Sequence, residues 1–357
     1  MFAPIRVLVV DDSALIRQML TRALSVDPRI EVVGVASDGV QAIEKALELD
    51  PDVITLDIEM PELSGLEALP HIIKKTEARV IMLSTLDDPE TTYQALSLGA
   101  VDFIPKPKKG FASNITDLAE LLIKKIMTVA RVDTSRVERA LGAKVSPPEV
   151  PERPKRAEQL SSLVILGAST GGPPALEKVF SGLDASLPAA YLIVQHLPAG
   201  FSAPLASRLS GSSGIPVAEA QEGQRIEPGR GYIAPYGRQM RIYSVRDSAP
   251  RVALGEDETV HGVCPAVDPL LTSAADEFDG GLVGVLLTGM GRDGVHGLGR
   301  VRAAGGKTIV QDEETSVVWG MPGAAVAEGV ADVVAPLERI PVEIRRAIRG
   351  GVPSSVR

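Results

Sequence analysis

A serine in a glycine-rich turn is the residue of this chain best suited to nucleophilic chemistry. Ser169 lies in residues 167–172 (Gly-Ala-Ser-Thr-Gly-Gly), between an apolar run of strand type and a segment that can form a helix. This strand–turn–helix context is that of a nucleophile elbow, which lifts a serine hydroxyl off the carboxyl edge of a sheet. Backbone N–H groups near Thr170 can then hold an oxyanion. A turn that cradles phosphate is the alternative, although the lysine of a P-loop is missing.

A histidine and an aspartate follow two other apolar runs and would complete a triad. His196 comes directly after one run, and Asp293 lies in a glycine-rich segment after another. Neighbouring strands are about 4.8 Å apart, so Ser169 and His196 are within reach of each other if their strands are adjacent. Asp293 would then orient the imidazole, and the backbone N–H of Met290 could serve the oxyanion. The order Ser–His–Asp differs from that of α/β-hydrolases, which disfavours that fold.

Each of these residues has a competing interpretation. His196 could be a core or capping histidine, and Asp293 could bond the N–H groups of its own turn. His296 competes as the base because it lies three residues from Asp293. Cys264 is more simply a buried, inert thiol than a nucleophile. His261 lies in the small antiparallel excursion expected in residues 215–268 and is harder to place than the other histidines.

A second set of polar residues lies upstream, again at the ends of strand-like runs. Asp11 and Asp12 follow the first run, Asp57 the third, Ser84 the fourth and Lys106 the fifth. In a parallel sheet these ends meet at one edge, where ligand sites form. Three carboxylates there favour a Mg²⁺ ion, and an aspartate can accept a phosphoryl group. The lysine would neutralise that group and the serine would hydrogen-bond it.

The elements that must position these residues alternate between strand and helix. In residues 1–128 we expect five strand–helix units forming a five-stranded, parallel, doubly wound α/β sheet. The expected strands are residues 7–10, 32–35, 53–56, 80–83 and 103–104. The expected helices are residues 14–24, 42–49, 66–75, 89–98 and 114–129, with Asn114 capping the last.

The pattern dissolves after this first domain and then resumes. Residues 129–159 are rich in proline and in charges of both signs, which predicts a linker. Residues 160–350 predict a second doubly wound, mostly parallel α/β domain. Within it, residues 215–268 suggest a small antiparallel excursion that includes the β-prone runs 231–234 and 239–245.

Composition limits the class of protein. The chain has 357 residues, a formal net charge of −9 and a single cysteine. The negative charge argues against non-specific binding to nucleic acid or to an anionic membrane. No apolar run approaches the roughly 18 residues of a membrane span, and the N-terminal residues do not resemble a signal peptide. One cysteine fits a reducing compartment, so we expect a cytoplasmic protein without an internal disulfide.

The upstream residues resemble the receiver domain of two-component response regulators. The resemblance covers about residues 4–125 and includes the acidic pair, the later aspartate, the serine and the Lys-Pro step. It implies that Asp57 is the phosphorylated residue and that Asp11 and Asp12 hold Mg²⁺ with it. It also implies that Phe103 takes part in the switch and that the bond before Pro107 is often cis.

The downstream motifs resemble the chemotaxis methylesterase family, CheB. They include residues 167–172, Gln-His at 195–196, Tyr-Ile-Ala-Pro at 232–235, Thr-Gly-Met-Gly at 288–291 and Gly-Met-Pro at 320–322. The resemblance implies that Ser169 is the nucleophile, His196 the base and acid, and Asp293 the orienting carboxylate. It implies hydrolysis of glutamate γ-methyl esters on chemoreceptors, with deamidation of glutamine in some members. No cofactor is expected for the hydrolase.

The same resemblance implies the partners. These are a chemotaxis sensor histidine kinase as phosphodonor and methyl-accepting chemoreceptors as substrate, with no nucleic acid and no membrane insertion. The sequence departs from the family around Pro265, where Val263 and Cys264 replace basic residues, and at Leu271, where an aromatic residue is frequent. These changes concern the choice of receptor more than the chemistry. Arg208 occupies a basic position that could meet acidic receptor helices.

Overall fold

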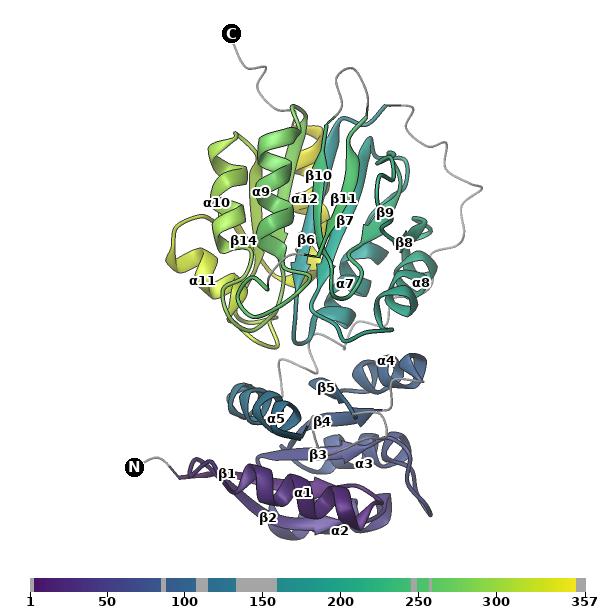
Figure 1. Cartoon of the computed structure of the whole chain (residues 1–357), viewed down its shortest axis with the longest axis vertical. Coiled ribbons are helices and arrows are strands. Elements are labelled where there is room, and N and C mark those ends of the chain that lie inside the picture. Colours follow the sequence, from purple (N-terminus) through teal and green to yellow (C-terminus); the bar gives the residue numbers. More distant parts are fainter. Residues whose placement is uncertain are drawn as a thin grey trace. The chain divides into compact units, whose positions relative to one another are not determined.

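The chain forms two compact units. The computed structural model describes residues 3–84, 88–106, 115–132, 159–244, 249–256 and 259–350 (Figure 1). The division between the units, Met1–Gly142 and Ala143–Arg357, falls inside the predicted linker. Most of that linker, Pro107 with its predicted cis bond and the predicted cap Asn114 lie outside the described residues. No helix in the described part is long and apolar enough to cross a bilayer.

The N-terminal unit is a parallel sheet of five strands, as the sequence predicts, and the strand order is β2-β1-β3-β4-β5. Each strand is followed by a helix, which is the alternation of a doubly wound fold. The strands are β1 (Ile5–Val10), β2 (Ile30–Ala36), β3 (Val53–Asp57), β4 (Arg79–Ser84) and β5 (Asp102–Pro105). The helices are α1 (Ala14–Leu24), α2 (Gly39–Leu49), α3 (Gly65–Lys75), α4 (Pro89–Ser97) and α5 (Ile115–Val129).

Local sequence signals explain where several of these elements begin. The central strand β3 is buried at all five positions, so its apolar run needs no alternation. Helix α3 begins with a capping box between Ser64 and Glu67, and α4 begins with Asp88 as its N-cap. Each cap satisfies backbone N–H groups that the first turn leaves open. These starts fix the short loops at the carboxyl edge of the sheet, where the polar residues gather.

The C-terminal unit contains a seven-stranded sheet in the order β14-β13-β12-β6-β7-β9-β8, in which every pairing is parallel. Its strands are β6 (Ser162–Ala168), β7 (Ala189–Gln195), β8 (Val217–Glu219), β9 (Gly231–Ile233), β12 (Gly281–Leu286), β13 (Lys307–Gln311) and β14 (Val333–Ala335). Its helices are α7 (Gly172–Ser181), α8 (Ser202–Ser213), α9 (Val267–Glu277), α10 (Val295–Ala303), α11 (Met321–Ala327) and α12 (Ile340–Arg349). Figure 1 shows α9 and α10 side by side against one face of this sheet.

One part of the predicted antiparallel excursion is wrong. Residues 231–233 form β9, which pairs in parallel with β7 and with β8 and so belongs to the main sheet. A run of three residues has no periodicity that separates parallel from antiparallel pairing. The strand lies close to β8, since a Cβ on Gly231 would lie 2.8 Å from a methyl group of Val217. Among the described residues, the antiparallel strands of this region are β10 (Gln239–Tyr243) and β11 (Arg251–Gly255), and isolated antiparallel bridges join Arg225 to Arg251 and Val260 to Val263.

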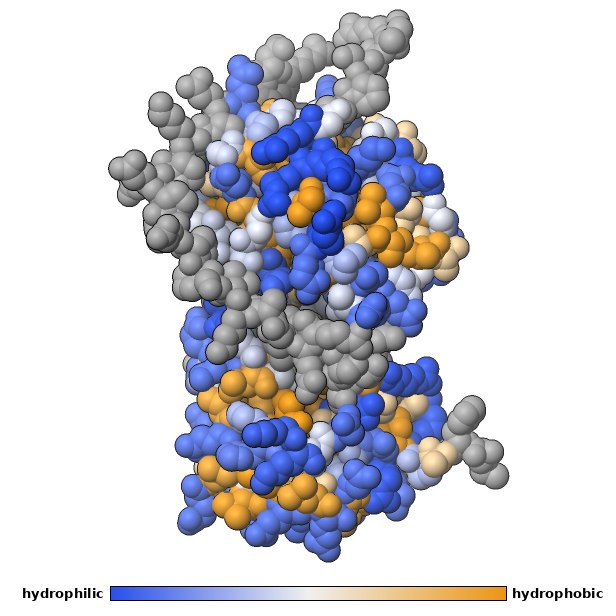
Figure 2. All heavy atoms as spheres, turned by 180° about the vertical axis from the view of Figure 1, so that it is seen from behind, coloured by the Kyte–Doolittle hydropathy of each residue, from blue (hydrophilic) through white to orange (hydrophobic). Residues whose placement is uncertain are grey.

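Apolar side chains also reach the surface, in patches separated by hydrophilic residues in the view of Figure 2. In the N-terminal unit the exposed large apolar side chains include Leu15, Val26, Val40 and Leu47. Scattered exposure of this kind is ordinary for folded proteins. The polar clusters at the strand ends are therefore more informative about function.

Candidate functional sites

Ser169 directly follows β6, the central strand of the C-terminal sheet. Its backbone N–H donates to the carbonyl of Thr288 at 3.0 Å, and its own carbonyl accepts from the N–H of Gly172 at 2.8 Å. Helix α7 begins at Gly172, so the partial positive charge of a helix N-terminus lies next to the serine. Within the described part of the chain, Ser169 Oγ makes no hydrogen bond of its own. The predicted strand–turn–helix context is confirmed.

The glycines of this turn are needed for close packing. Gly171 has φ 75°, a conformation that favours glycine, and a Cβ there would lie 2.7 Å from Cβ of Val317. A Cβ on Gly172 would lie 1.9 Å from Oε1 of Gln195. The Gln195 amide also donates to the Ser169 carbonyl at 2.8 Å. Gln195 thus fixes the turn that carries the serine. Its hydrogen bond to the Ser169 carbonyl cannot be seen from the sequence alone.

His196 is brought to the same sheet edge by β7. That strand pairs with β6, so the condition for Ser169 and His196 to lie at neighbouring strand ends is met, and the His196 N–H continues the ladder to the carbonyl of Ala168 at 3.1 Å. The imidazole Nε2 hydrogen-bonds Asp293 Oδ2 at 2.8 Å. The His196 side chain is 13% exposed and that of Asp293 is 2% exposed. Because Nε2 faces the aspartate, Nδ1 is the ring nitrogen left for another partner.

Asp293 is buried but well supplied with donors. Its Oδ2 accepts from the N–H of Val267 at 2.7 Å, and its Oδ1 accepts from the N–H of Asp268 at 3.1 Å. These two N–H groups open α9, so the aspartate caps that helix from a distant part of the chain. Burial acts to raise the pKa of Asp293, but the hydrogen bond and charge of His196 and the two N–H groups outweigh it and lower that pKa. The carboxylate is therefore held in its charged form.

The structure also decides among the competing residues. His296 is exposed and makes no hydrogen bond to Asp293 among the described residues. His196 does, and is therefore the better candidate for the base. Cys264 is half-buried, so the expectation of a buried thiol is wrong; its loop runs between the antiparallel strands and α9 and is only partly covered. His261 hydrogen-bonds a different carboxylate, that of Asp268. Arg208 pairs with Glu177 at 2.6 Å.

The loop that carries Met290 packs against the serine. A Cβ on Gly289 would lie 2.8 Å from Cβ of Ser169 and 2.5 Å from Sδ of Met321. Gly289 forms a β-bridge with the half-buried Trp319, and its carbonyl accepts from the N–H of Met321 at 2.8 Å. The predicted oxyanion residue Met290 thus directly follows a glycine that touches the serine.

Thr288 supports both loops beside the serine. Its hydroxyl donates to the Thr170 carbonyl at 2.9 Å and accepts from the N–H of Val318 at 2.9 Å. Thr288 and Thr170 are both buried. From the sequence this threonine is visible only as part of a motif, because its hydrogen bonds to Thr170 and Val318 join segments far apart in the chain.

The predicted acidic cluster forms at the carboxyl edge of the N-terminal sheet. Lys106 Nζ lies 2.8 Å from Asp11 Oδ2 and 2.5 Å from Asp57 Oδ2. Both aspartates are buried, whereas Asp12 is exposed. Burial raises the pKa of Asp57 to about 6; the charge and hydrogen bond of Lys106 act against this, and the charges of Asp11 and Asp12 add to it.

This cluster fits a divalent cation. Oxygens of Asp11, Asp12 and Asp57 lie within 4.8 Å of one another, and the carboxylates outnumber the one lysine that contacts them. The Asp11 Oδ2 atom is buried and accepts no hydrogen bond of good geometry, although it lies close to the lysine. Carboxylate oxygens are the ligands that Mg²⁺ prefers.

Of the predicted switch residues, Lys106 contacts this cluster and Ser84 is bonded to Lys106. Ser84 ends β4, is buried, and shares a hydrogen bond of 2.5 Å with the hydroxyl of Thr92 on α4. The N–H of Lys106 donates to the carbonyl of Ser84 at 2.6 Å, which joins the ends of β4 and β5. Phe103 is buried in β5. The serine thereby connects the acidic cluster to α4, a link that the sequence alone does not show.

Fold and sites together define a two-unit protein in which a receiver-type sheet precedes an α/β unit with a Ser–His–Asp edge. The chain belongs to the CheB methylesterase family: the family profile matches residues 164–344, and that of the response regulator receiver domain matches residues 7–114. The receiver fold and the methylesterase fold expected from the sequence are thereby confirmed.

Relatives match over nearly the whole length. A protein-glutamate methylesterase/protein-glutamine glutaminase of Pyrococcus abyssi is 44% identical, over 97% of this chain and 95% of the relative. One from Xanthomonas campestris is 45% identical, over 94% of this chain and 95% of the relative. The crystal structure of the Thermotoga maritima CheB methylesterase catalytic domain is 38% identical, with a TM-score of 0.50, and covers 53% of this chain and 98% of that structure.

Proposed function

We propose that this protein hydrolyses γ-methyl esters of glutamate on chemoreceptors, releasing methanol, and also deamidates receptor glutamine. The observation that carries the proposal is the Asp293–His196 hydrogen bond at the sheet edge beside Ser169. Relatives named protein-glutamate methylesterase/protein-glutamine glutaminase support the choice of ester and amide over other acyl compounds. Both substrates present a carbonyl on the same short side chain, so one site serves both.

The proposed reaction begins with transfer of the Ser169 Oγ proton to His196 while the oxygen attacks the ester carbonyl. Since Nε2 faces Asp293 at 2.8 Å, Nδ1 is the nitrogen that takes the proton. This reverses the ring orientation of chymotrypsin-type triads. Asp293 stabilises the imidazolium that forms. The hydrogen bond from Ser169 Oγ to Nδ1 is expected to form on substrate binding, since catalytic contacts often become short only in the complex.

The later steps use the same groups. Backbone N–H groups of Thr170 and Met290 are the proposed donors to the tetrahedral oxyanion. His196 returns its proton to the leaving methanol, or to ammonia in deamidation, and the acyl-enzyme remains. Water then attacks this ester, with His196 acting first as base and then as acid, and Ser169 is released.

We propose that phosphorylation of Asp57 by a sensor histidine kinase regulates this reaction. Mg²⁺, held by Asp11, Asp12 and Asp57, would supply positive charge to the incoming phosphoryl group. Lys106 would neutralise the charge that remains. Ser84 would hydrogen-bond the phosphoryl group. Its hydroxyl would then turn away from Thr92, and the loss of that hydrogen bond would shift α4. Phosphorylation would shift the N-terminal unit between two states, and the rate of hydrolysis at Ser169 would differ between them.

Methanol release from methylated receptor cytoplasmic domains tests both halves of the proposal. We expect release by the full chain, and a higher rate with acetyl phosphate and Mg²⁺. In Asp57→Ala the basal rate should remain and the increase should vanish. Absence of release from every methylated receptor domain would contradict the esterase assignment, and an increase that survives in Asp57→Ala would contradict the switch.

Removal of the nucleophile provides the matched control. Ser169→Ala should lower kcat by about 10⁴-fold or more, because the acyl-enzyme cannot form. A fluorophosphonate probe should label the wild-type chain and leave the variant unlabelled, with the label located by peptide mass spectrometry. Labelling at another residue, or near-normal turnover by the variant, would refute the triad.

A further inference from the structure

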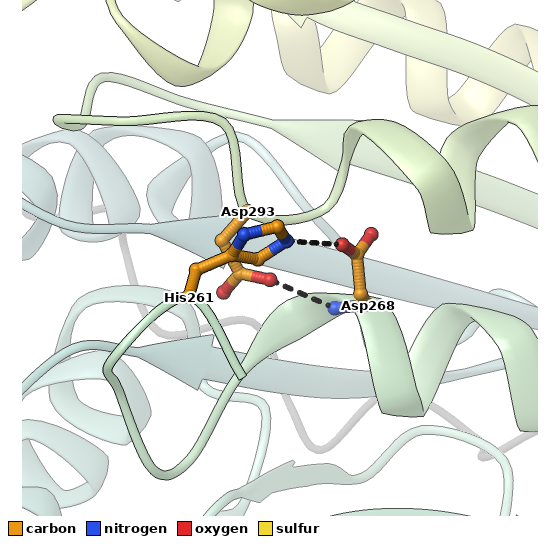
Figure 3. Close-up of side chains that lie close together, drawn as sticks. All are labelled: His261, Asp268 and Asp293. Atoms are coloured by element: carbon orange, nitrogen blue, oxygen red, sulfur yellow. Dashed lines mark hydrogen bonds and ion pairs between the residues drawn. The ribbon is translucent and has the colours of Figure 1, made fainter. Parts of the chain in front are cut away.

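A second histidine–aspartate pair lies next to Asp293 and has no part in the triad (Figure 3). His261 Nε2 hydrogen-bonds Asp268 Oδ2 at 2.9 Å, and Asp268 Oδ1 accepts from the N–H of Gly297 at 2.7 Å. The Asp268 side chain is 8% exposed, whereas that of His261 is 39% exposed. Asp268 therefore joins the loop of His261 and the start of α10 to the first turn of α9.

That first turn of α9 is what holds Asp293. The N–H groups of Val267 and Asp268 donate to its two carboxylate oxygens, and one of these bonds appears in Figure 3. The residue before the helix, Ala266, supplies no side-chain cap of its own. Any rotation of this turn therefore moves the Asp293 carboxylate, and with it His196.

Close packing fixes the distance of this turn from its surroundings. A Cβ on Gly167 would lie 2.6 Å from a methyl group of Val267, and one on Gly294 would lie 3.0 Å from the other methyl group. A Cβ on Gly297 would lie 2.4 Å from Cβ of Leu271. Apolar contacts of this kind have little directional preference. The orientation of the turn thus depends on its hydrogen bonds, including those of Asp268.

The pair also has an electrostatic consequence. Ligand atoms of His261, Asp268 and Asp293 all lie within 4.8 Å of one another. Two carboxylates so close repel each other strongly where water is excluded. A divalent cation would offset the repulsion between the two carboxylates. Each of their four oxygens already accepts a hydrogen bond, however, which disfavours a cation there. These contacts favour a proton donor, His261, as the group that offsets the charge of Asp268.

The backbone at His261 supports a role for its side chain. His261 has φ 55°, which residues other than glycine seldom adopt. The turn is closed by backbone hydrogen bonds between Val260 and Val263, at 3.1 and 3.0 Å. A residue held in such a conformation is a reasonable sign of a functional constraint.

We propose that His261 is a positioning residue for the proposed triad. By donating to Asp268 it would keep the first turn of α9 oriented so that Asp293 holds His196 toward Ser169. The inference rests on the proposed esterase function, and it concerns a residue that would not touch the substrate.

The test compares His261→Asn with His261→Gln in the full chain, because an asparagine amide reaches only the position of Nδ1 and a glutamine amide reaches that of Nε2. Asparagine also tolerates a positive φ, so the Asn variant should fold. We expect His261→Asn to lower kcat for methanol release about 10- to 100-fold with KM unchanged, as misplaced catalytic groups do. His261→Gln should restore most of the loss. His296→Ala, at a nearby exposed histidine, should behave as wild type.

Three outcomes would overturn the proposal. One is wild-type kcat in a folded His261→Asn variant, and another is an equal loss in the Asn and Gln variants. The third is a higher KM at unchanged kcat, which would make His261 a substrate contact. Failure of the proposed function is separate, since wild-type chain would then release no methanol and take no fluorophosphonate label at Ser169.

Discussion

At the scale of single residues, the proposed chemistry depends on which charges the interior accepts. Asp293 is buried with three hydrogen-bond donors, and its pKa is lowered despite that burial. Asp57 is buried with one lysine and two acidic neighbours, and its pKa is raised to about 6. The two aspartates therefore suit opposite tasks. Asp293 is a permanent charge beside a histidine. Asp57 is an anion that is stabilised when it binds a cation or loses its charge.

The raised pKa of Asp57 predicts a pH-dependent stability. An unfolded aspartate titrates near 3.8, so between that pH and about 6 the folded N-terminal unit keeps a proton that the unfolded chain has lost. Raising the pH through this window should lower the free energy of unfolding, by about 3 kcal/mol from this residue. Urea unfolding without Mg²⁺ at several pH values measures it. Asp57→Asn should lack most of the loss, and an identical pH profile in both proteins would contradict the argument.

At the scale of elements, α9 and the loop after β12 determine the geometry beside Ser169. Helix α9 takes its N-terminal cap from Asp293, so the same carboxylate serves the helix and the histidine. The loop after β12 approaches the serine so closely that only glycine fits at position 289. A substitution of Asp293 is therefore expected to change both stability and activity. A substitution of Gly289 is expected to change activity with a smaller effect on stability.

Two substitutions of Asp293 should separate its capping role from its role toward His196. Asp293→Ala removes every acceptor, so we expect about 1 kcal/mol less stability as well as loss of activity. Asp293→Asn keeps an acceptor for α9 and should lose less stability, yet kcat should still fall about 10⁴-fold because the imidazolium is no longer stabilised. Chemical denaturation and methanol release give the two quantities. Substantial activity in the Asn variant would argue against the orienting role.

Substitution of Gly289 tests the close approach of the loop. A methyl group there meets the flexible Met321 side chain but also Cβ of Ser169, which has no freedom to move aside. We expect Gly289→Ala to lower kcat about 100-fold, since small displacements of a nucleophile have effects of that size. Gly299→Ala in α10 is the control, because its nearest neighbour would be at an ordinary 3.6 Å. Equal activity of the two variants would show that the loop adapts.

Much of this arrangement could be predicted from the sequence. The strands ending near Ser169, His196 and Asp57 were predicted because a parallel sheet places strand ends at one edge. The parallel pairing of β9 was missed, because a three-residue strand carries no periodicity that separates parallel from antiparallel pairing.

The contacts of Gln195, Thr288 and His261 could not be predicted in this way. Each joins segments that come together only after the sheet has formed, and a hydrogen bond between distant loops leaves no local pattern. The glycine-rich turns were visible in the sequence as a nucleophile elbow or a phosphate cradle. The close packing at Gly171, Gly172 and Gly289 was not predicted, because it depends on side chains from distant segments.

At the scale of the whole molecule, two separate sheets each carry a polar cluster at the carboxyl edge. A covalent change at Asp57 can affect Ser169 only through an interaction between the units that differs between two states. The chain matches both the receiver-domain model and the methylesterase model, which agrees with a regulated hydrolase. Each sheet has its own core and is expected to unfold as its own cooperative unit.

Mg²⁺ should therefore stabilise one unit and leave the other unchanged. Calorimetry of the full chain should show two transitions, of which only that of the N-terminal unit rises in temperature with Mg²⁺. In Asp57→Asn the rise should largely disappear, because one of the three carboxylates is gone. A Mg²⁺-dependent shift of both transitions, or of neither, would be inconsistent with a cation site confined to the acidic cluster.

The bridge between Gly289 and Trp319 has an optical consequence. Trp319 is the one tryptophan of the 357 residues, and its indole lies against Gly323 at the start of α11. Its emission therefore comes from the segment that packs behind the proposed nucleophile. The unmodified protein thus contains a natural fluorophore close to the proposed nucleophile, and we expect acylation of Ser169 to change its intensity in a stopped-flow instrument.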